Sequence, residues 1–573
     1  MAKISKKVEM IKNIKKFISD NNLDGYIIPK NDEFFTEYSK INRLEIVANF
    51  SGSAGFILIL KNSNHLFVDG RYTIQAKRQS GKKFKIHEIP YVWPKDILKN
   101  NVSPKIGFDP KLFTTETLKT YFNNSCNLFP INSNLFKNKN EIINRNNLVY
   151  LINTSIAGES SKSKIKRLKK ILENEKIDNL FISSGENVCW LLNIRGKDLP
   201  NSPIANFQAI ITSNKNIILF GNIKKLKNIK KELVKNKISF YGKNDFFKIL
   251  ISLKGKSFCI DNKTCSVINE KLISSKFLIK KRVDPINYLK SIKNRVEIKN
   301  MIETHIKDGV AVTKFLYWIK NANIKKLDEI KVEKKLESFR KQSKNYLFPS
   351  FSTIAGSGPN GAIIHYRSNK KSNRKLNKNH LLLIDSGGQY KWGTTDITRT
   401  ISFSDPSKKT KELYTRVLKG HIAVAMSKID KLKNGNNLDK LARKSLNSVN
   451  LNYSHGTGHG VGFFMNVHEG PQSISKNNFI KLKKGMIVSN EPGIYLENKL
   501  GIRIENLVYI DGKNKNLFFK NLTFAPLEKD LIDENLLTKI EKDYIFSYHL
   551  QTYSKISAYL NNKERKWLAK LIQ

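Results

Sequence analysis

The sequence predicts an α/β (α+β) protein of several domains, on three observations. The chain has 573 residues, too many for one hydrophobic core. Strand-like apolar runs alternate with helical patterns in the first half, and this rhythm starts again near residue 155. A long amphipathic helix then precedes a region rich in glycine, histidine and acidic residues. We therefore expect two similar α/β domains, a third domain and a helical extension, at residues 1–150, 151–290, 291–512 and 513–573.

Local signals support each part in chain order. In the first part, GFILIL (55–60) and HLFVDGRY (65–72) have the composition of strands. A helix is expected to begin after Ala157, capped by Ser160 or Ser161. The second part then repeats the strand, turn and helix rhythm of the first, which suggests an old duplication.

A long helix and a group of C-terminal helices complete the pattern. Segment 295–321 has apolar residues at helical spacing and predicts an amphipathic helix. GIRIENLVYI (501–510) predicts one continuous strand. The last 60 or so residues end in helical patterns and carry no recognisable motif.

Composition favours a globular protein of a reducing compartment. Apolar residues make up 40% of the chain, and its four cysteines are scattered without a CxxC pair. The N-terminus predicts an amphipathic helix rather than a signal peptide. Because no run of about 18 apolar residues occurs, we expect no membrane span and a cytoplasmic location.

The net charge of +53 has two explanations. Dense positive charge would attract a nucleic acid or an anionic membrane. Alternatively, the excess is mostly lysine, spread along the chain with abundant Asn and Ile, as a genome rich in A and T would produce. Since no arginine-rich run, zinc finger or RNA-binding aromatic motif accompanies the charge, we expect no specific nucleic-acid partner.

Two acidic residues lie on adjoining predicted strands. In LLLIDSGGQY (381–390) an apolar run ends at Asp385, which on its own would be better explained as a cap of the turn at Gly387-Gly388. The β-branched segment TTDITRTISF (394–403) predicts a strand that carries Asp396. A short glycine-containing connection predicts that these strands pair as a hairpin. Neighbouring carboxylates repel each other, and a bound metal is the usual resolution.

Histidines and further acids follow downstream. His455, His459 and His468 lie among glycines in HGTGHGVGFFMNVHEGP, which predicts a tight loop close to a ligand. Neutral imidazole suits Zn, Mn, Fe or Co. Glu491 precedes a proline, and Glu505 lies in a predicted apolar strand.

Charge counting indicates two metal ions. Asp385, Asp396, Glu491 and Glu505 carry four negative charges, which two divalent cations would neutralise. His459 adds a nitrogen ligand, and an oxygen-rich set of this kind favours Mn²⁺. A pair of metals about 3.5–4 Å apart is the usual apparatus of amide hydrolysis.

The ordered contexts DSGG, TTDITRT, HGTGHGVG, NEPG and GIRIEN resemble the pita-bread metallopeptidases. FSTIAGSGPNGAIIHYR, NVCWLLNIRG and VDGRY are similar to the aminopeptidase P branch, over essentially the whole chain. The resemblance implies two creatinase-like N-terminal α/β domains before a pita-bread catalytic domain. It implies a dinuclear aminopeptidase that cleaves between an N-terminal residue and a following proline.

The resemblance also implies a role for each site residue. Asp385 would bind one metal, His459 and Glu491 the other, and Asp396 and Glu505 both. Glu491 would take the proton of the attacking water. His365 and His468 would hold the substrate, and His455 would be a further pocket histidine. Arg71 would contact the peptide, and Arg503 would be a further substrate-binding residue.

Alternatives and partners follow from the same resemblance. A prolidase-like dipeptidase would share the metal site, and an inactive binding protein would have the same fold. We expect two Mn²⁺ per chain, with Co²⁺ or Zn²⁺ possible, peptides with proline at the second position, and a homodimer.

Overall fold

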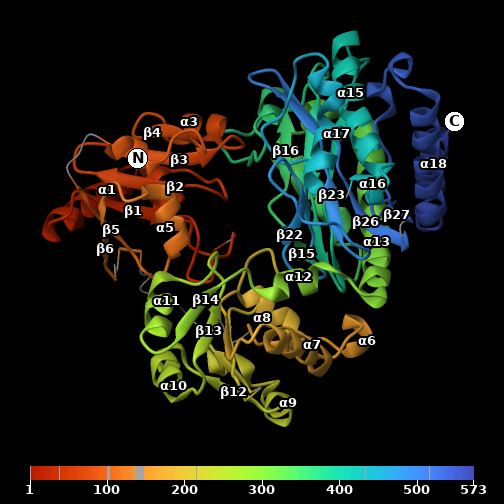
Figure 1. The fold of residues 1–573 in the computed structure, drawn as a ribbon. Coiled ribbons are helices and arrows are strands. Elements are labelled where there is room, and N and C mark those ends of the chain that lie inside the picture. The colour runs from red at the N-terminus through yellow and green to blue at the C-terminus, as the bar shows by residue number, and fades with distance from the viewer. Residues whose placement is uncertain are drawn as a thin grey trace. The chain divides into compact units, whose positions relative to one another are not determined.

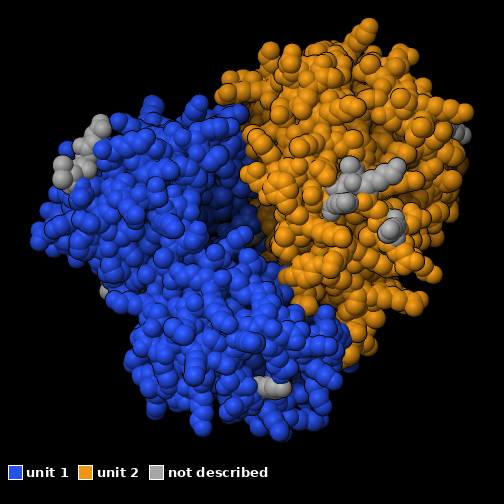
Figure 2. Space-filling view, viewed as in Figure 1, with its two compact units in different colours: residues 1–153, 159–287 blue, residues 154–158, 288–573 orange. Residues whose placement is uncertain are grey.

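The computed structural model describes residues 2–37, 39–99, 103–132, 135–136, 147–214, 216–432, 434–514 and 516–572. The chain divides into two compact units, Met1–Asn153 with Glu159–Asn287 and Thr154–Gly158 with Tyr288–Gln573 (Figure 2). We call them unit 1 and unit 2, and each is described by itself.

Unit 1 contains two larger sheets of the same topology. The first has the order β4-β3-β2-β1-β5-β6, and the second has the order β12-β11-β10-β8-β13-β14. In each sheet the strand that comes first in the chain, β1 or β8, pairs antiparallel with one neighbour and parallel with the other. The matching topology agrees with the predicted repeat of one α/β pattern. The strands are β1 (Gly25–Pro29), β2 (Phe56–Leu60), β3 (Asn64–Asp69), β4 (Lys85–Ile89), β5 (Lys105–Phe108), β6 (Asn127–Pro130), β7 (Tyr150–Leu151), β8 (Asn179–Ile182), β9 (Ile194–Arg195), β10 (Gln208–Ile211), β11 (Ile217–Phe220), β12 (Ile238–Tyr241), β13 (Ser257–Ile260) and β14 (Leu278–Lys281).

The helices of unit 1 cover these sheets with apolar faces. Ile14 and Ile18 of α1 are fully buried in the core of the first sheet. Ser160 caps α7 by accepting a hydrogen bond from the Ser163 N–H, as the sequence predicts. The helices are α1 (Ala2–Asp20), α2 (Arg43–Ala48), α3 (Thr73–Ser80), α4 (Pro94–Leu98), α5 (Thr115–Phe122), α7 (Ser161–Asn174), α8 (Gly185–Leu192), α9 (Lys230–Lys235), α10 (Phe246–Ser252) and α11 (Val267–Ser274).

Unit 2 places small sheets among long helices (Figure 1). Its strands are β15 (Tyr346–Pro349), β16 (Ile354–Ser357), β17 (Leu382–Ser386), β18 (Gly388–Tyr390), β19 (Gly393–Thr394), β20 (Ile397–Ile401), β21 (Gly458–Gly460), β22 (Glu469–Ile474), β23 (Ile487–Asn490), β24 (Gly493–Leu496), β25 (Leu500–Arg503), β26 (Asn506–Lys513) and β27 (Asn516–Asn521). Strand β17 is central in the order β16-β17-β20, and β23 is central in β22-β21-β23-β26-β27.

Helix α13 (Arg295–Asn321) has the bounds that its apolar spacing predicts. Asn294 caps it, with Glu297 completing a capping box. The other helices are α6 (Thr154–Ala157), α12 (Pro285–Ser291), which crosses between the units, α14 (Glu329–Arg340), α15 (Lys408–Ala425), α16 (Ile429–Leu432), α17 (Gly435–Asn447), α18 (Lys539–Ile556) and α19 (Asn562–Lys570). None of the helices in the described ranges is long and apolar enough to cross a membrane.

Two strand predictions need correction. The segments around Asp385 and Asp396 do pair, since β17 and β20 are antiparallel, but β18 and β19 lie between them in another sheet, so the connection is not a simple hairpin. The predicted strand 501–510 is interrupted between β25 and β26, and Glu505 lies in the break. Its backbone instead forms an isolated bridge to Thr398.

A buried ion pair ties α13 to α14. The Asp308 carboxylate accepts hydrogen bonds at 2.7 Å from Arg340 Nε and from the Tyr390 hydroxyl. Burial alone would raise the pKa of Asp308, but Arg340 and Tyr390 hold it below its ordinary value. The carboxylate therefore depends on these partners.

We predict that Arg340→Leu lowers the free energy of unfolding by about 3–5 kcal/mol, because it leaves a buried carboxylate without its cation. Denaturant unfolding followed by circular dichroism measures the change. The double variant Asp308→Leu/Arg340→Leu should recover most of the loss. Wild-type stability of the single variant would contradict the prediction.

Candidate metal centre

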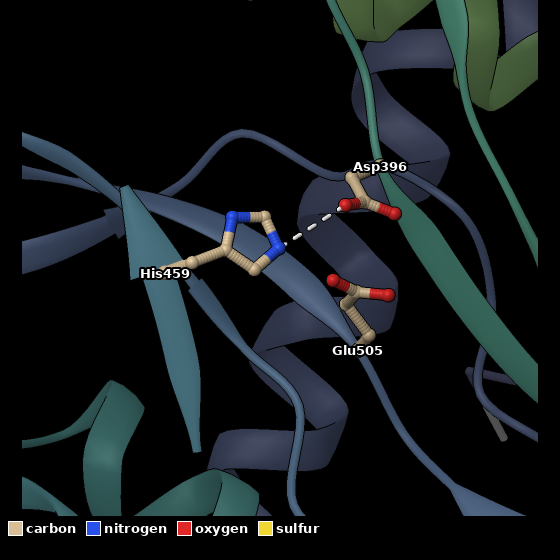
Figure 3. A group of neighbouring side chains, drawn as sticks. All are labelled: Asp396, His459 and Glu505. Carbon is tan, nitrogen blue, oxygen red and sulfur yellow. Dashed lines mark ion pairs between the residues drawn. The ribbon is translucent and has the colours of Figure 1, made fainter. Parts of the chain in front are cut away.

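Three predicted ligands converge in unit 2. One ligand atom each of Asp396, His459 and Glu505 lies within 4.8 Å of the others (Figure 3). Asp396 directly precedes β20, His459 is on β21, and Glu505 lies between β25 and β26. Asp396 and Glu505, more than a hundred residues apart in the sequence, thus meet at one point together with His459. Acidic residues on a solvated surface would have no reason to converge in this way.

Thr398 on β20 positions Glu505. Its hydroxyl donates to Glu505 Oε2 at 2.8 Å, and its carbonyl accepts from the Glu505 N–H at 3.2 Å. The same hydroxyl accepts from Arg503 Nε at 3.2 Å. One short side chain therefore orients both an acid and its neighbouring arginine.

His459 directs its Nε2 toward the acids. Its Nδ1 lies 3.0 Å from the Gly460 carbonyl, which can only accept, so Nδ1 carries the proton. Its Nε2 lies 3.4 Å from Asp396 Oδ2 and 3.4 Å from Glu491 Oε1. The tautomer is the one that a metal-binding imidazole needs.

Asp385 and Glu491 border this group. Asp385 Oδ2 accepts from Arg503 Nη2 at 2.6 Å. Glu491 follows β23, and its Oε1 accepts from the Ser489 hydroxyl at 3.0 Å. Besides burial, which is the larger cause, the charges of Asp385 and Glu491 raise the pKa of both Asp396 and Glu505, so all four carboxylates interact.

The buried oxygens of this cluster fit a divalent cation. Asp385 Oδ1, Asp396 Oδ1 and Glu505 Oε1 are buried and have no hydrogen-bond partner among the described residues. Burial, and then the neighbouring carboxylates, raise the pKa of Asp396 and Glu505 well above the ordinary value. Unpartnered buried oxygens beside an imidazole nitrogen are an unfavourable arrangement that metal binding relieves.

The other predicted residues lie around or apart from the centre. The ring of His468 lies edge-on to the ring of His459, with 4.3 Å between the two ring centroids. His455 Nε2 lies 2.9 Å from the Tyr495 hydroxyl. His365 is half-buried in the loop after β16. Arg71 belongs to unit 1, where it forms a bidentate pair with Asp69 at 2.8 Å, so its contact with peptide stays a prediction.

The sequence interpretation missed two residues of the centre. Ser489 accepts from the His459 N–H at 2.9 Å and donates to Glu491, so it orients two ligands. Tyr495 accepts from Arg503 Nη1 at 2.7 Å and contacts His455. Ser489 lies two residues before Glu491, and this alternation was the one available signal.

We predict that Asp396→Asn removes at least one metal ion per chain and lowers turnover about a thousandfold or more, on the scale of losing one principal catalytic element. Elemental analysis of dialysed, metal-loaded protein gives the first readout and peptide hydrolysis the second. Asp405→Asn is the matched control, since that side chain is 89% exposed. An Asp396→Asn chain with full metal content and normal turnover would make Asp396 an ordinary strand residue.

Family models match along the chain. The Creatinase/Prolidase N-terminal domain matches residues 10–133 and, by a second model, 143–297. Metallopeptidase family M24 matches 299–512, and the C-terminal region of peptidase M24 matches 515–573. The match at 299–512 covers the whole metal centre.

Relatives and solved structures agree with these models. Xaa-Pro aminopeptidase 1 of Dictyostelium discoideum is 34% identical and aligns with 100% of this chain and 96% of its own length. The X-prolyl aminopeptidase of Caenorhabditis elegans, a cytosolic enzyme with a di-nuclear active site, has a TM-score of 0.92 at 27% identity, covering 99% of both chains. The prolidase of Pyrococcus horikoshii OT3 has a TM-score of 0.52 at 27% identity and covers only 64% of this chain.

These comparisons confirm the resemblance and separate its branches. Likeness over the full length is to the aminopeptidases, whereas the prolidase matches a part. The chain therefore belongs to the Xaa-Pro aminopeptidases of metallopeptidase family M24.

Proposed function

We propose that this metal-dependent hydrolase cleaves the peptide bond between an N-terminal residue and a following proline at a centre of two divalent metal ions. The observation that carries the proposal is the set of unpartnered buried carboxylate oxygens around His459 Nε2. Full-length likeness to Xaa-Pro aminopeptidases supports the substrate class.

Five residues would hold the metals. Asp385 would hold one ion, His459 and Glu491 would hold the other, and Asp396 and Glu505 would be shared by both. Four carboxylates balance the charge of two divalent cations. When bound, the pair supplies Lewis acidity toward the scissile carbonyl and a nucleophilic water at neutral pH.

Glu491 acts as the general base. The hydrogen bond from Ser489 fixes its Oε1 beside the ligand His459. Glu491 takes a proton from the attacking water as the oxygen bonds to the carbonyl carbon. As the C–N bond breaks, Glu491 gives this proton to the proline nitrogen, which leaves as a secondary amine.

Histidines hold the substrate around this step. His365 and His468 donate hydrogen bonds that strengthen as the carbonyl becomes tetrahedral. His455 lines the pocket. Arg503 holds Asp385 through the 2.6 Å bond and thereby orients a ligand, and Arg71 contacts the peptide.

The remaining assignments concern the metal and the assembly. An oxygen-rich set with one imidazole favours Mn²⁺, with Co²⁺ or Zn²⁺ as substitutes. We further propose a cytoplasmic homodimer, in line with the cytosolic Caenorhabditis relative.

We predict that metal removal abolishes hydrolysis and that Mn²⁺ or Co²⁺ restores it, since the residues alone supply no electrophile. A panel of X-Pro, X-Pro-Y and X-Ala-Y peptides, tested on stripped and restored enzyme, measures both points. X-Pro-Y should be cleaved best. Cleavage of X-Pro dipeptides alone would make the enzyme a prolidase-like dipeptidase, and full activity after verified metal removal would exclude the metal mechanism.

We predict that His365→Ala keeps the metal content and the melting temperature while kcat falls about a hundredfold or more, with a smaller change in KM. The reason is that its hydrogen bond forms mainly in the transition state. Metal analysis, a melting curve and kinetics on one preparation measure all three. If metal is lost together with activity, His365 is a ligand or a structural support instead.

A further inference from the structure

The loop that carries His365 surrounds one buried carboxylate. Glu329, the first residue of α14, is 0% exposed. Segment 357–374 runs from the end of β16 around this side chain. The sequence motifs do not include Glu329, and it has no part in the proposed metal binding or proton transfer.

Four groups donate hydrogen bonds to this carboxylate. Glu329 Oε1 accepts from the Ser357 N–H at 2.8 Å and from Asn360 Nδ2 at 3.0 Å. Glu329 Oε2 accepts from the Tyr366 hydroxyl at 2.7 Å and from the Arg374 N–H at 2.9 Å. These donors are spread over the whole loop, on both sides of His365.

No cation balances the charge of Glu329 within the described ranges of the chain, where none of the salt bridges includes it. Burial raises the pKa of Glu329, and the hydrogen bonds act in the opposite direction. A buried carboxylate held by neutral donors alone is costly to fold. Its one evident effect is to fix the loop.

Ile364, the residue before His365, is tied to the metal centre. The Ile364 carbonyl lies 3.4 Å from Arg503 Nη2, and the same nitrogen donates to Asp385. On the opposite side, Tyr366 reaches Glu329. The backbone of His365 is thus held between the predicted ligand Asp385 and the Glu329 carboxylate.

We propose that Glu329 is a positioning residue that holds His365 at the scissile bond. The inference rests on the proposed function, in which His365 stabilises the tetrahedral state. Glu329 does not touch substrate. Its contribution to the rate passes through His365, so removing either residue should forfeit much of the same stabilisation.

A double-mutant cycle of Glu329→Gln with His365→Ala tests this coupling. The amide keeps the shape of the carboxylate but turns N–H groups toward neighbours that also donate, which loosens the loop. We expect Glu329→Gln alone to lower kcat about tenfold or more, with metal content unchanged. In the His365→Ala background, the same change should lower kcat by less than about threefold.

Glu333→Gln is the matched control. Glu333 lies one turn further along α14 and is half-buried, and it accepts a hydrogen bond from the Ser368 hydroxyl at 3.2 Å. Turnover of this variant should remain within about twofold of wild type, because the control leaves the four donors of Glu329 in place.

The outcomes are distinct. Multiplicative effects of Glu329→Gln and His365→Ala on kcat would make Glu329 an ordinary structural residue and overturn the inference alone. A wild-type chain that does not cleave X-Pro-Y peptides would overturn the proposed function. If Glu329→Gln fails to fold, Tyr366→Phe, which removes one donor, enters the same cycle and must show the same coupling to His365.

Discussion

The mutual repulsion of four carboxylates is the constraint on which unit 2 depends. Asp396 and Glu505 are 4% and 1% exposed, so water screens their charges little. Arg503 contacts the group through Asp385. Such a cluster persists only if the surrounding structure holds the acids together and a ligand offsets their charge.

The scaffold meets this constraint by holding the backbone around the acids. Arg399, 2% exposed, donates to the carbonyls of Thr398 and Glu505 and to those of Ala525 and Pro526. Its Nη2 also lies 3.0 Å from the hydroxyl of Tyr548 on α18. Helix α18, which carries no recognisable motif, thereby braces the segments that carry Asp396 and Glu505.

Much of the secondary structure and the family could be predicted from the sequence because both depend on local patterns. The period of apolar residues predicted the bounds of α13, strand-like runs predicted β2 and β3, and a β-branched run predicted β20. The five acid and histidine contexts identified the family. The roles of single residues and the boundaries of the four domains stay predictions. Glu329 and Tyr495 escaped, because a lone acid or tyrosine in a helix or strand has no pattern until the fold brings its partners together.

The break at Glu505 shows why pattern alone misplaces ligands. In a continuous strand, residues 503, 505 and 507 would point to one face at fixed spacing. The chain instead leaves the ladder after Arg503, bridges Thr398 at Glu505, and enters a different sheet at Asn506. A ligand at such a break takes its direction from both sheets and not from the pleat of one. Asp396, just before β20, is placed in the same way, so two of the predicted ligands lie next to strand ends, whereas Asp385 and His459 lie within β17 and β21.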